Sequence, residues 1–99
     1  MKKILIVDDD VAVTNYFMVF LMQTEMFETT VINDSRQVEE CLEEEHFDVI
    51  MLDLDMPNVT GMDILGMMNT KEIDIPVVIL TGVNDVDLAV KTMNRKSVV

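Results

Sequence analysis

The sequence has few basic residues, a single cysteine and no long apolar run. Among 99 residues Cys41 is the only cysteine, so no internal disulfide forms and nothing indicates an oxidising compartment. Seven Lys and Arg residues stand against 19 Asp and Glu residues, which gives a formal net charge of -12. Such a chain lacks the cations that displace counterions from a phosphate backbone, and anionic lipid repels it. We therefore expect this chain to bind neither nucleic acid nor a membrane.

The apolar segments are too short for a membrane span or a secretory signal. Lys2 and Lys3 precede the apolar residues 4–7, but this run stops at Asp8 and is too short for the core of a signal peptide. The apolar run at residues 16–22 is far shorter than the roughly 20 residues of a spanning helix. We expect a cytoplasmic protein.

Half of the composition is apolar, which indicates a folded domain. Apolar residues make up 49% of the chain, and its length fits one domain at residues 1–99. Ten methionines accompany only four Phe and one Tyr. The predicted core is therefore aliphatic and rich in flexible side chains.

Four short apolar runs alternate with segments of helical pattern. The predicted strands are residues 4–7, 30–32, 49–52 and 77–80. The predicted helices are residues 11–24, 36–45, 62–69 and a segment that starts near residue 85. This alternation predicts an α/β fold with a parallel sheet and helices on both faces. The second strand is the shortest and most polar, so we expect it at an edge.

Polar residues follow three of the predicted strands. Asp8 and Asp9 follow the first strand, Asp53 and Asp55 follow the third, and Thr81 follows the fourth. Ligands bind open parallel sheets at the carboxyl ends of the strands. If the first and third strands are neighbours, several carboxylates converge there, and clustered carboxylates repel one another unless a cation joins them. Carboxylate oxygens suit Mg²⁺, which binds through one or two of them and keeps several waters.

Taken singly, these residues have simpler interpretations. Asp10 is expected to cap the helix that follows it, and Asp53 alone fits a turn as well as a site. Thr81 alone is a typical strand residue. Cys41 lies on an apolar helix stripe and is interpreted as a buried thiol, whereas His46, without a second imidazole or thiol nearby, is interpreted as a surface residue. These residues form a site only if the three strand ends meet at one edge of the sheet.

Together the motifs resemble the receiver domain of two-component response regulators. The resemblance runs from the first strand to the fourth helix, and it depends on the joint spacing of its parts. The matching parts are residues 4–9, residues 49–57, Gly61 and residues 76–82. The resemblance implies a flavodoxin-like fold, a doubly wound parallel sheet with strand order 2-1-3-4-5.

The resemblance also implies roles for single residues. Asp53 would be the phosphoacceptor. Asp8 and Asp9 would hold Mg²⁺ together with Asp53 and the backbone carbonyl of Asp55. Thr81 would be the switch hydroxyl that contacts the phosphoryl group. A histidine kinase would be the donor, and the chain would be a signalling switch rather than an enzyme.

The sequence departs from the family pattern after the fourth helix. The family continues with a fifth strand that ends in Lys-Pro and with a fifth helix, and we expect neither in this C-terminally shortened chain. The expected strand order is then 2-1-3-4. Strand 77–80 would be an open edge, and helix 11–24, which is apolar nearly all round, would expose apolar surface. We expect a homodimer formed through these surfaces.

Two other functions remain open at this point. Without the lysine of the fifth strand, the chain could be an interaction or dimerisation module that has lost phosphorylation. The Asp53-Leu54-Asp55 motif followed by Thr81 also resembles the haloacid-dehalogenase phosphatases. Those enzymes carry Asp-x-Asp early in the chain and need a later lysine and acidic metal ligands, so this alternative is the weaker one.

Overall fold

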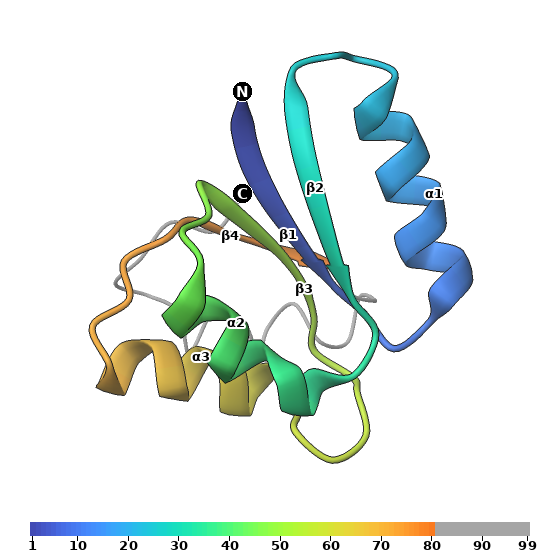
Figure 1. The fold of residues 1–99 in the computed structure, drawn as a ribbon. Helices are drawn as coiled ribbons and strands as arrows, with labels where there is room; N and C mark the ends of the chain where they lie inside the picture. Colours follow the sequence, from blue (N-terminus) through green and yellow to red (C-terminus); the bar gives the residue numbers. More distant parts are fainter. Residues whose placement is uncertain (81–99) are drawn as a thin grey trace.

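The computed structural model describes residues 1–80, in which strands and helices alternate (Figure 1). The strands are β1 (Lys2–Val7), β2 (Phe27–Ile32), β3 (Val49–Asp53) and β4 (Val77–Leu80). The helices are α1 (Val11–Met22), the 3-10 helix η1 (Ser35–Gln37), α2 (Val38–Glu44) and α3 (Gly61–Thr70). The predicted helix near residue 85 lies outside the described residues, as do Thr81 and Gly82.

The four strands form one parallel sheet in the order β2-β1-β3-β4, which confirms the expected order 2-1-3-4. As expected, β2 lies at an edge of this sheet. It is longer than predicted, beginning at Phe27 rather than Thr30, because Lys2 and Lys3 of β1 pair with Phe27 and Glu28. The polar residues at its start hid it from the hydrophobic pattern.

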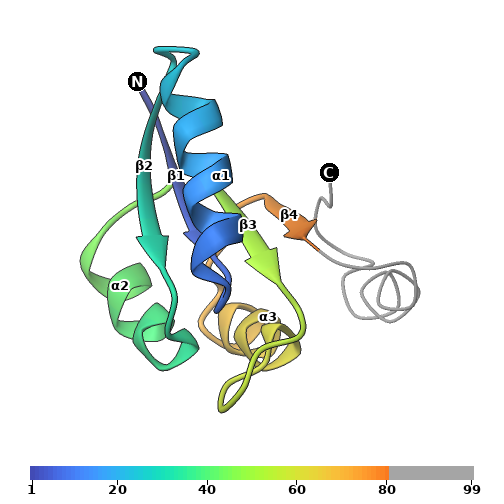
Figure 2. The same ribbon diagram turned by 90° about the vertical axis from the view of Figure 1, so that its right-hand side faces the viewer.

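Helices cover both faces of the sheet, with α1 on one face and α2 and α3 on the other (Figures 1 and 2). The central strand β1 is buried from Ile4 to Val7, as a strand covered on both sides must be. The main core lies between the sheet and the pair α2 and α3. It contains Leu5, Val7, Ile50, Leu52, Ile64, Leu65 and Met68, with Val38 and Phe47.

Short-range hydrogen bonds explain where the helices begin. The Asp10 carboxylate accepts a hydrogen bond from the backbone N–H of Ala12 at 2.9 Å, which confirms the predicted cap of α1. Thr60 and Asp63 form a reciprocal capping box at the start of α3. Cys41 is half-buried against the core, and the His46 side chain is 78% exposed, in line with its interpretation as a surface residue.

Candidate functional site

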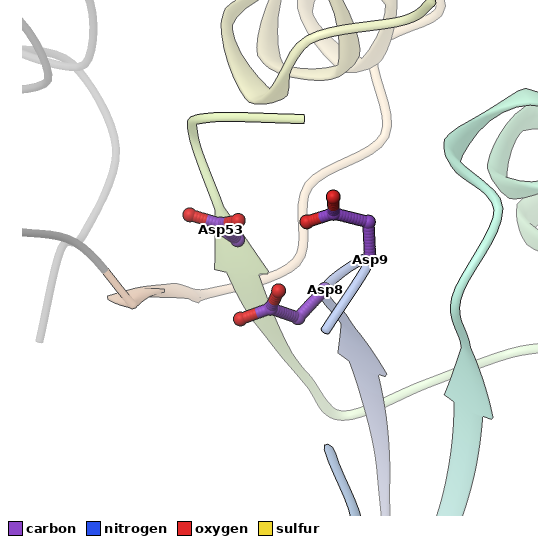
Figure 3. Close-up of side chains that lie close together, drawn as sticks. All are labelled: Asp8, Asp9 and Asp53. Atoms are coloured by element: carbon purple, nitrogen blue, oxygen red, sulfur yellow. The ribbon is translucent and has the colours of Figure 1, made fainter. Parts of the chain in front are cut away.

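The sheet brings together three carboxylates that are far apart in the sequence. Val7 of β1 pairs with Leu52 of β3, so Asp8 and Asp53 follow at neighbouring strand ends. Asp8, Asp9 and Asp53 each offer a ligand atom within 4.8 Å of the others. Figure 3 shows these side chains gathered where β1 and β3 end. We refer to Asp8, Asp9 and Asp53 as the acidic cluster.

Burial and mutual repulsion favour the protonated forms of two of these carboxyls. Burial raises the pKa of Asp8, which is only 6% exposed, and the charge of Asp9 adds to this. Burial, together with the charges of Asp8 and Asp9, raises the pKa of Asp53 to about 6. The backbone N–H groups of Asp10 and Asp55 oppose these shifts by donating to the Asp8 and Asp53 carboxylates at 2.9 and 3.2 Å.

The acidic cluster fits a hard divalent cation. Its donors are carboxylate oxygens on two neighbouring strand ends, within reach of one ion. Burial, followed by the charges of neighbouring carboxylates, raises the pKa of Asp8 and of Asp53, and a bound cation would favour the charged forms of both. Asp9 is exposed and Asp53 is half-buried, so an ion held by them could keep part of its water shell. The residues present therefore fit Mg²⁺.

The other predicted site residues are placed less completely. Asp55 is exposed two residues after Asp53, and its backbone N–H donates to the Asp53 carboxylate. Thr81 lies outside the described residues. The structure thus brings together Asp8, Asp9 and Asp53, and it leaves Thr81 and the Asp55 carbonyl as predictions.

Gly61 has a role that the sequence did not reveal. It is the first residue of α3, and its N–H donates to the Leu54 carbonyl at 3.1 Å. A Cβ at Gly61 would lie 2.4 Å from the Asp53 carbonyl oxygen and 2.6 Å from the Leu54 Cα. Glycine therefore allows α3 to lie directly against the backbone of Asp53.

Two polar residues after β2 were also missed as part of the site. Asn33 donates to the Asp8 carbonyl at 2.8 Å, and Ser35 donates to the Pro57 carbonyl at 3.1 Å. The second predicted strand ends at the same edge as the first and third. Asn33 directly follows that strand, just as Asp8 follows the first strand, and this position in the sequence is the signal that marks it as a neighbour of the site.

Known proteins place this arrangement in a family. The parallel sheet with order 2-1-3-4 and its flanking helices form a flavodoxin-like fold. The family model for the response regulator receiver domain matches residues 4–98 of this chain. The chain therefore belongs to this family, the receiver domains of two-component systems.

Three similar proteins illustrate the match. Regulatory protein VirG of Rhizobium rhizogenes is 34% identical over 82 residues, which are 83% of this chain and 33% of VirG. Transcriptional regulatory protein FixJ of Bradyrhizobium diazoefficiens is 30% identical over 96% of this chain and 46% of FixJ. Response regulator protein TrrA of Thermotoga maritima, whose crystal structure was solved in complex with Mg²⁺-BeF, is 25% identical in sequence to this chain. It has a TM-score of 0.82 and covers all of this chain and 87% of that one. The chain thus spans about a third of the length of VirG and about half of the length of FixJ.

Within the residues that the structure describes, no helix is long and apolar enough to cross a membrane.

Replacing Asp9 with Ala is expected to weaken Mg²⁺ binding at least tenfold, because a carboxylate donor is lost from the acidic cluster. Calorimetric titration with MgCl₂ measures this. Glu44→Gln, which removes one charge from the exposed side of α2, is the matched control and should bind Mg²⁺ as the wild type does. Equal affinities of Asp9→Ala and wild type would remove Asp9 from the site.

The metal-free protein is expected to become more stable as the pH falls from 8 to about 5. The pKa of Asp53 is raised to about 6 in the folded state, and that of Asp8 is also raised, so both carboxyls bind protons more tightly folded than unfolded. Above pH 6 the charged Asp53 carboxylate therefore destabilises the fold. This destabilisation is relieved as the pH falls through 6 towards about 4, the pKa of an aspartate in the unfolded chain. After allowance for solvent screening we expect a gain on the order of 1 kcal/mol.

Urea unfolding in EDTA at pH 7.5 and 5.5, followed by circular dichroism, measures this gain. The gain should shrink in Asp53→Asn, which cannot titrate at that position. A wild type that loses stability over this interval would contradict the expected repulsion.

Proposed function

We propose that this chain is a phosphorylatable receiver domain in which Asp53 accepts a phosphoryl group from a histidine kinase with the help of Mg²⁺. The observation that carries the proposal is the acidic cluster, at the carboxyl ends of β1 and β3, in a chain of this family. A relative, the sensor kinase/phosphatase CqsS of Vibrio cholerae, is 29% identical over 84% of this chain, and TrrA was crystallised with Mg²⁺-BeF. The name of CqsS supports a kinase partner, and the Mg²⁺-BeF complex of TrrA supports a magnesium cofactor.

The residues of the site have distinct tasks. Asp8, Asp9, Asp53 and the Asp55 carbonyl would hold Mg²⁺, which when bound offsets the repulsion of an anionic donor and stabilises the equatorial oxygens. The Asp55 N–H holds Oδ1 of Asp53, and this orients the carboxylate for attack. An Asp53 oxygen forms a bond to phosphorus as the bond to the donor's leaving group breaks, and the electron pair departs with that group. An acyl phosphate remains on Asp53.

The phosphorylated state is the signal, so the chain acts as a switch and turns over no external substrate. We propose that the Thr81 hydroxyl contacts the phosphoryl oxygens, which gives the phosphorylated state a contact that the free state lacks. We place the domain in the cytoplasm, and this fits its lone cysteine.

Incubation with acetyl phosphate tests the proposal against its alternatives. With Mg²⁺ we expect a stoichiometric phosphoprotein, and with EDTA we expect none. Sustained release of phosphate from p-nitrophenyl phosphate would favour the phosphatase alternative. Mg²⁺ binding without any phosphoprotein would favour an interaction module that has lost phosphorylation.

We further propose that two copies associate through the exposed face of α1. Tyr16, Val19 and Phe20 are 66, 50 and 55% exposed, and the Tyr16 and Phe20 rings stack with their centroids 6.5 Å apart. They line a shallow apolar groove of about 430 Å³. Exposed apolar surface of this kind favours a protein partner, and an α1 without charged residues imposes no like-charge contact at its centre.

Light scattering across a dilution series measures this association. We expect the mass to rise toward that of a dimer with concentration, and to rise further with salt, because salt screens the repulsion between two copies that each carry a formal charge of -12. Phe20→Glu should remain a monomer. A wild type that is monomeric at every concentration would contradict the dimer and would leave the phosphoacceptor proposal standing.

A further inference from the structure

The turn after β2, residues 33–35, contributes no ligand atom to the acidic cluster, but it contacts the segment that carries Asp8 and Asp9 and the loop that follows Asp53. Ile32 of β2 pairs with Val7 of β1, so Asn33 comes beside Asp8 at the same edge of the sheet. The side-chain nitrogen of Asn33 donates to the Asp8 carbonyl at 2.8 Å and to Oγ1 of Thr14 at 2.9 Å. Asn33 therefore joins the end of β1 to the first turns of α1.

These two hydrogen bonds close the segment that carries Asp8 and Asp9. The Asp8 N–H donates to the Ile32 carbonyl at 3.2 Å, so the start of the segment is fixed to β2 as well. Its other end is fixed at Thr14, which is fully buried and donates its hydroxyl proton to the Val11 carbonyl at 3.1 Å. Asp9 lies between these anchors, and its position relative to Asp53 follows from them.

Ser35 makes the corresponding contacts with the other half of the site. It is 5% exposed, its hydroxyl donates to the Pro57 carbonyl at 3.1 Å, and it accepts from the Val59 N–H at 3.3 Å. Pro57 and Val59 belong to the loop between β3 and α3, which begins directly after Asp53. One short turn thus holds both the segment that carries Asp8 and Asp9 and the loop that follows Asp53.

We propose that Asn33 and Ser35 are positioning residues that set the separation of Asp8 and Asp9 from Asp53. This inference rests on the proposed magnesium site and extends it beyond the residues that touch the ion. Mg²⁺ requires near-ideal octahedral geometry at short distances, so a displacement of one loop by a fraction of an ångström weakens binding. The three carboxylates also repel one another, and the turn resists their separation while no cation joins them.

The Mg²⁺ affinity of the folded protein distinguishes a positioning residue from one that only supports the fold. A hydrogen bond that only supports the fold changes the unfolding equilibrium when it is removed, and the folded protein still binds Mg²⁺ as before. A positioning residue changes the Mg²⁺ affinity of the folded protein. Asn33 is exposed, so its replacement by Ala leaves no buried cavity and the variant is expected to fold.

The test compares Mg²⁺ dissociation constants of folded proteins by calorimetric titration. We expect Asn33→Ala and Ser35→Ala each to weaken Mg²⁺ binding about 3- to 10-fold. This lies at or just below the loss of affinity that is typical when a residue that supports a metal ligand is replaced. The double variant should bind Mg²⁺ more weakly still. Thr14→Val removes the hydroxyl that accepts a hydrogen bond from Asn33 but keeps the shape of the side chain, so it should also weaken Mg²⁺ binding. Thr14→Ser and Ser35→Thr keep the hydroxyl and should bind Mg²⁺ as the wild type does.

Lys71→Gln is the matched control for lost stability. It breaks ion pairs that join α3 to α2, with the Lys71 nitrogen 2.8 Å from Glu39 and 2.5 Å from Glu43, away from the acidic cluster. We expect it to lower the urea midpoint in EDTA and to leave the Mg²⁺ affinity within twofold of wild type. In phosphorylation by acetyl phosphate, the Asn33 and Ser35 variants should need more Mg²⁺ for half-maximal rate and should reach the wild-type rate at saturation.

The outcomes separate the two proposals. Wild-type affinity in Asn33→Ala, Ser35→Ala and Thr14→Val would overturn the positioning role and leave the magnesium site intact. A wild type that binds no Mg²⁺ would overturn both.

Discussion

Asp53→Asn is expected to abolish phosphorylation while it stabilises the metal-free fold. The amide is a poor nucleophile, so no acyl phosphate forms. Asp53 is also the carboxyl whose pKa is raised to about 6 by burial and by Asp8 and Asp9, and the substitution removes this repelled charge at neutral pH. We expect the free energy of unfolding in EDTA at pH 7.5 to increase by on the order of 1 kcal/mol.

Urea unfolding of Asp53→Asn beside Glu44→Gln separates a local effect from a general one. Both variants remove one negative charge from the same chain, but only Asp53 lies in the acidic cluster. The control should change the free energy of unfolding by less. A decrease in the stability of metal-free Asp53→Asn would contradict the repulsion that the structure indicates.

Gly61→Ala is expected to cost about 3 kcal/mol of stability and to weaken Mg²⁺ binding. The new Cβ would lie 2.4 Å from the Asp53 carbonyl oxygen and 2.6 Å from the Leu54 Cα. Both are backbone atoms, so the contact can be relieved only if α3 or the end of β3 moves. Because Asp53 is the last residue of β3, such a movement displaces the proposed phosphoacceptor.

Gly66→Ala is the matched control, since it makes the same substitution on the same helix. A Cβ at Gly66 meets no atom within 4 Å, so this variant gains helix propensity at no steric cost. We expect it to be more stable than wild type by roughly 0.5–1 kcal/mol, with unchanged Mg²⁺ affinity. Chemical unfolding and calorimetric titration measure both effects. If Gly61→Ala behaved as Gly66→Ala does, the close approach of α3 to Asp53 would be refuted.

The parts of this architecture that were predictable from the sequence depend on local patterns. The continuous apolar runs at β1, β3 and β4 marked strands of a parallel sheet, and the polar residues that follow all three marked the binding edge. The start of β2 was missed because Glu28 and Thr29 look like loop residues, and their place in the strand comes from pairing with β1.

The supporting parts of the site were not predictable because they depend on contacts between distant residues. Asn33 reaches Asp8 across 25 positions of sequence, and Ser35 reaches Pro57 across 22. Gly61 gives no sign in the sequence that its hydrogen atom faces the Asp53 backbone. The sequence of α1, apolar nearly all round, likewise does not show which side is covered: among its residues only Thr14 is buried, whereas Tyr16 and Phe20 are exposed.

Intact-mass measurement shows directly whether Asp53 takes the phosphoryl group. The wild type and Asp53→Asn are incubated side by side with Mg²⁺ and acetyl phosphate, after circular dichroism has shown that both are folded. We expect one phosphoryl adduct on the wild type and none on the variant. An adduct on Asp53→Asn, or a folded wild type that gains none, would contradict the assignment of Asp53 as the phosphoacceptor.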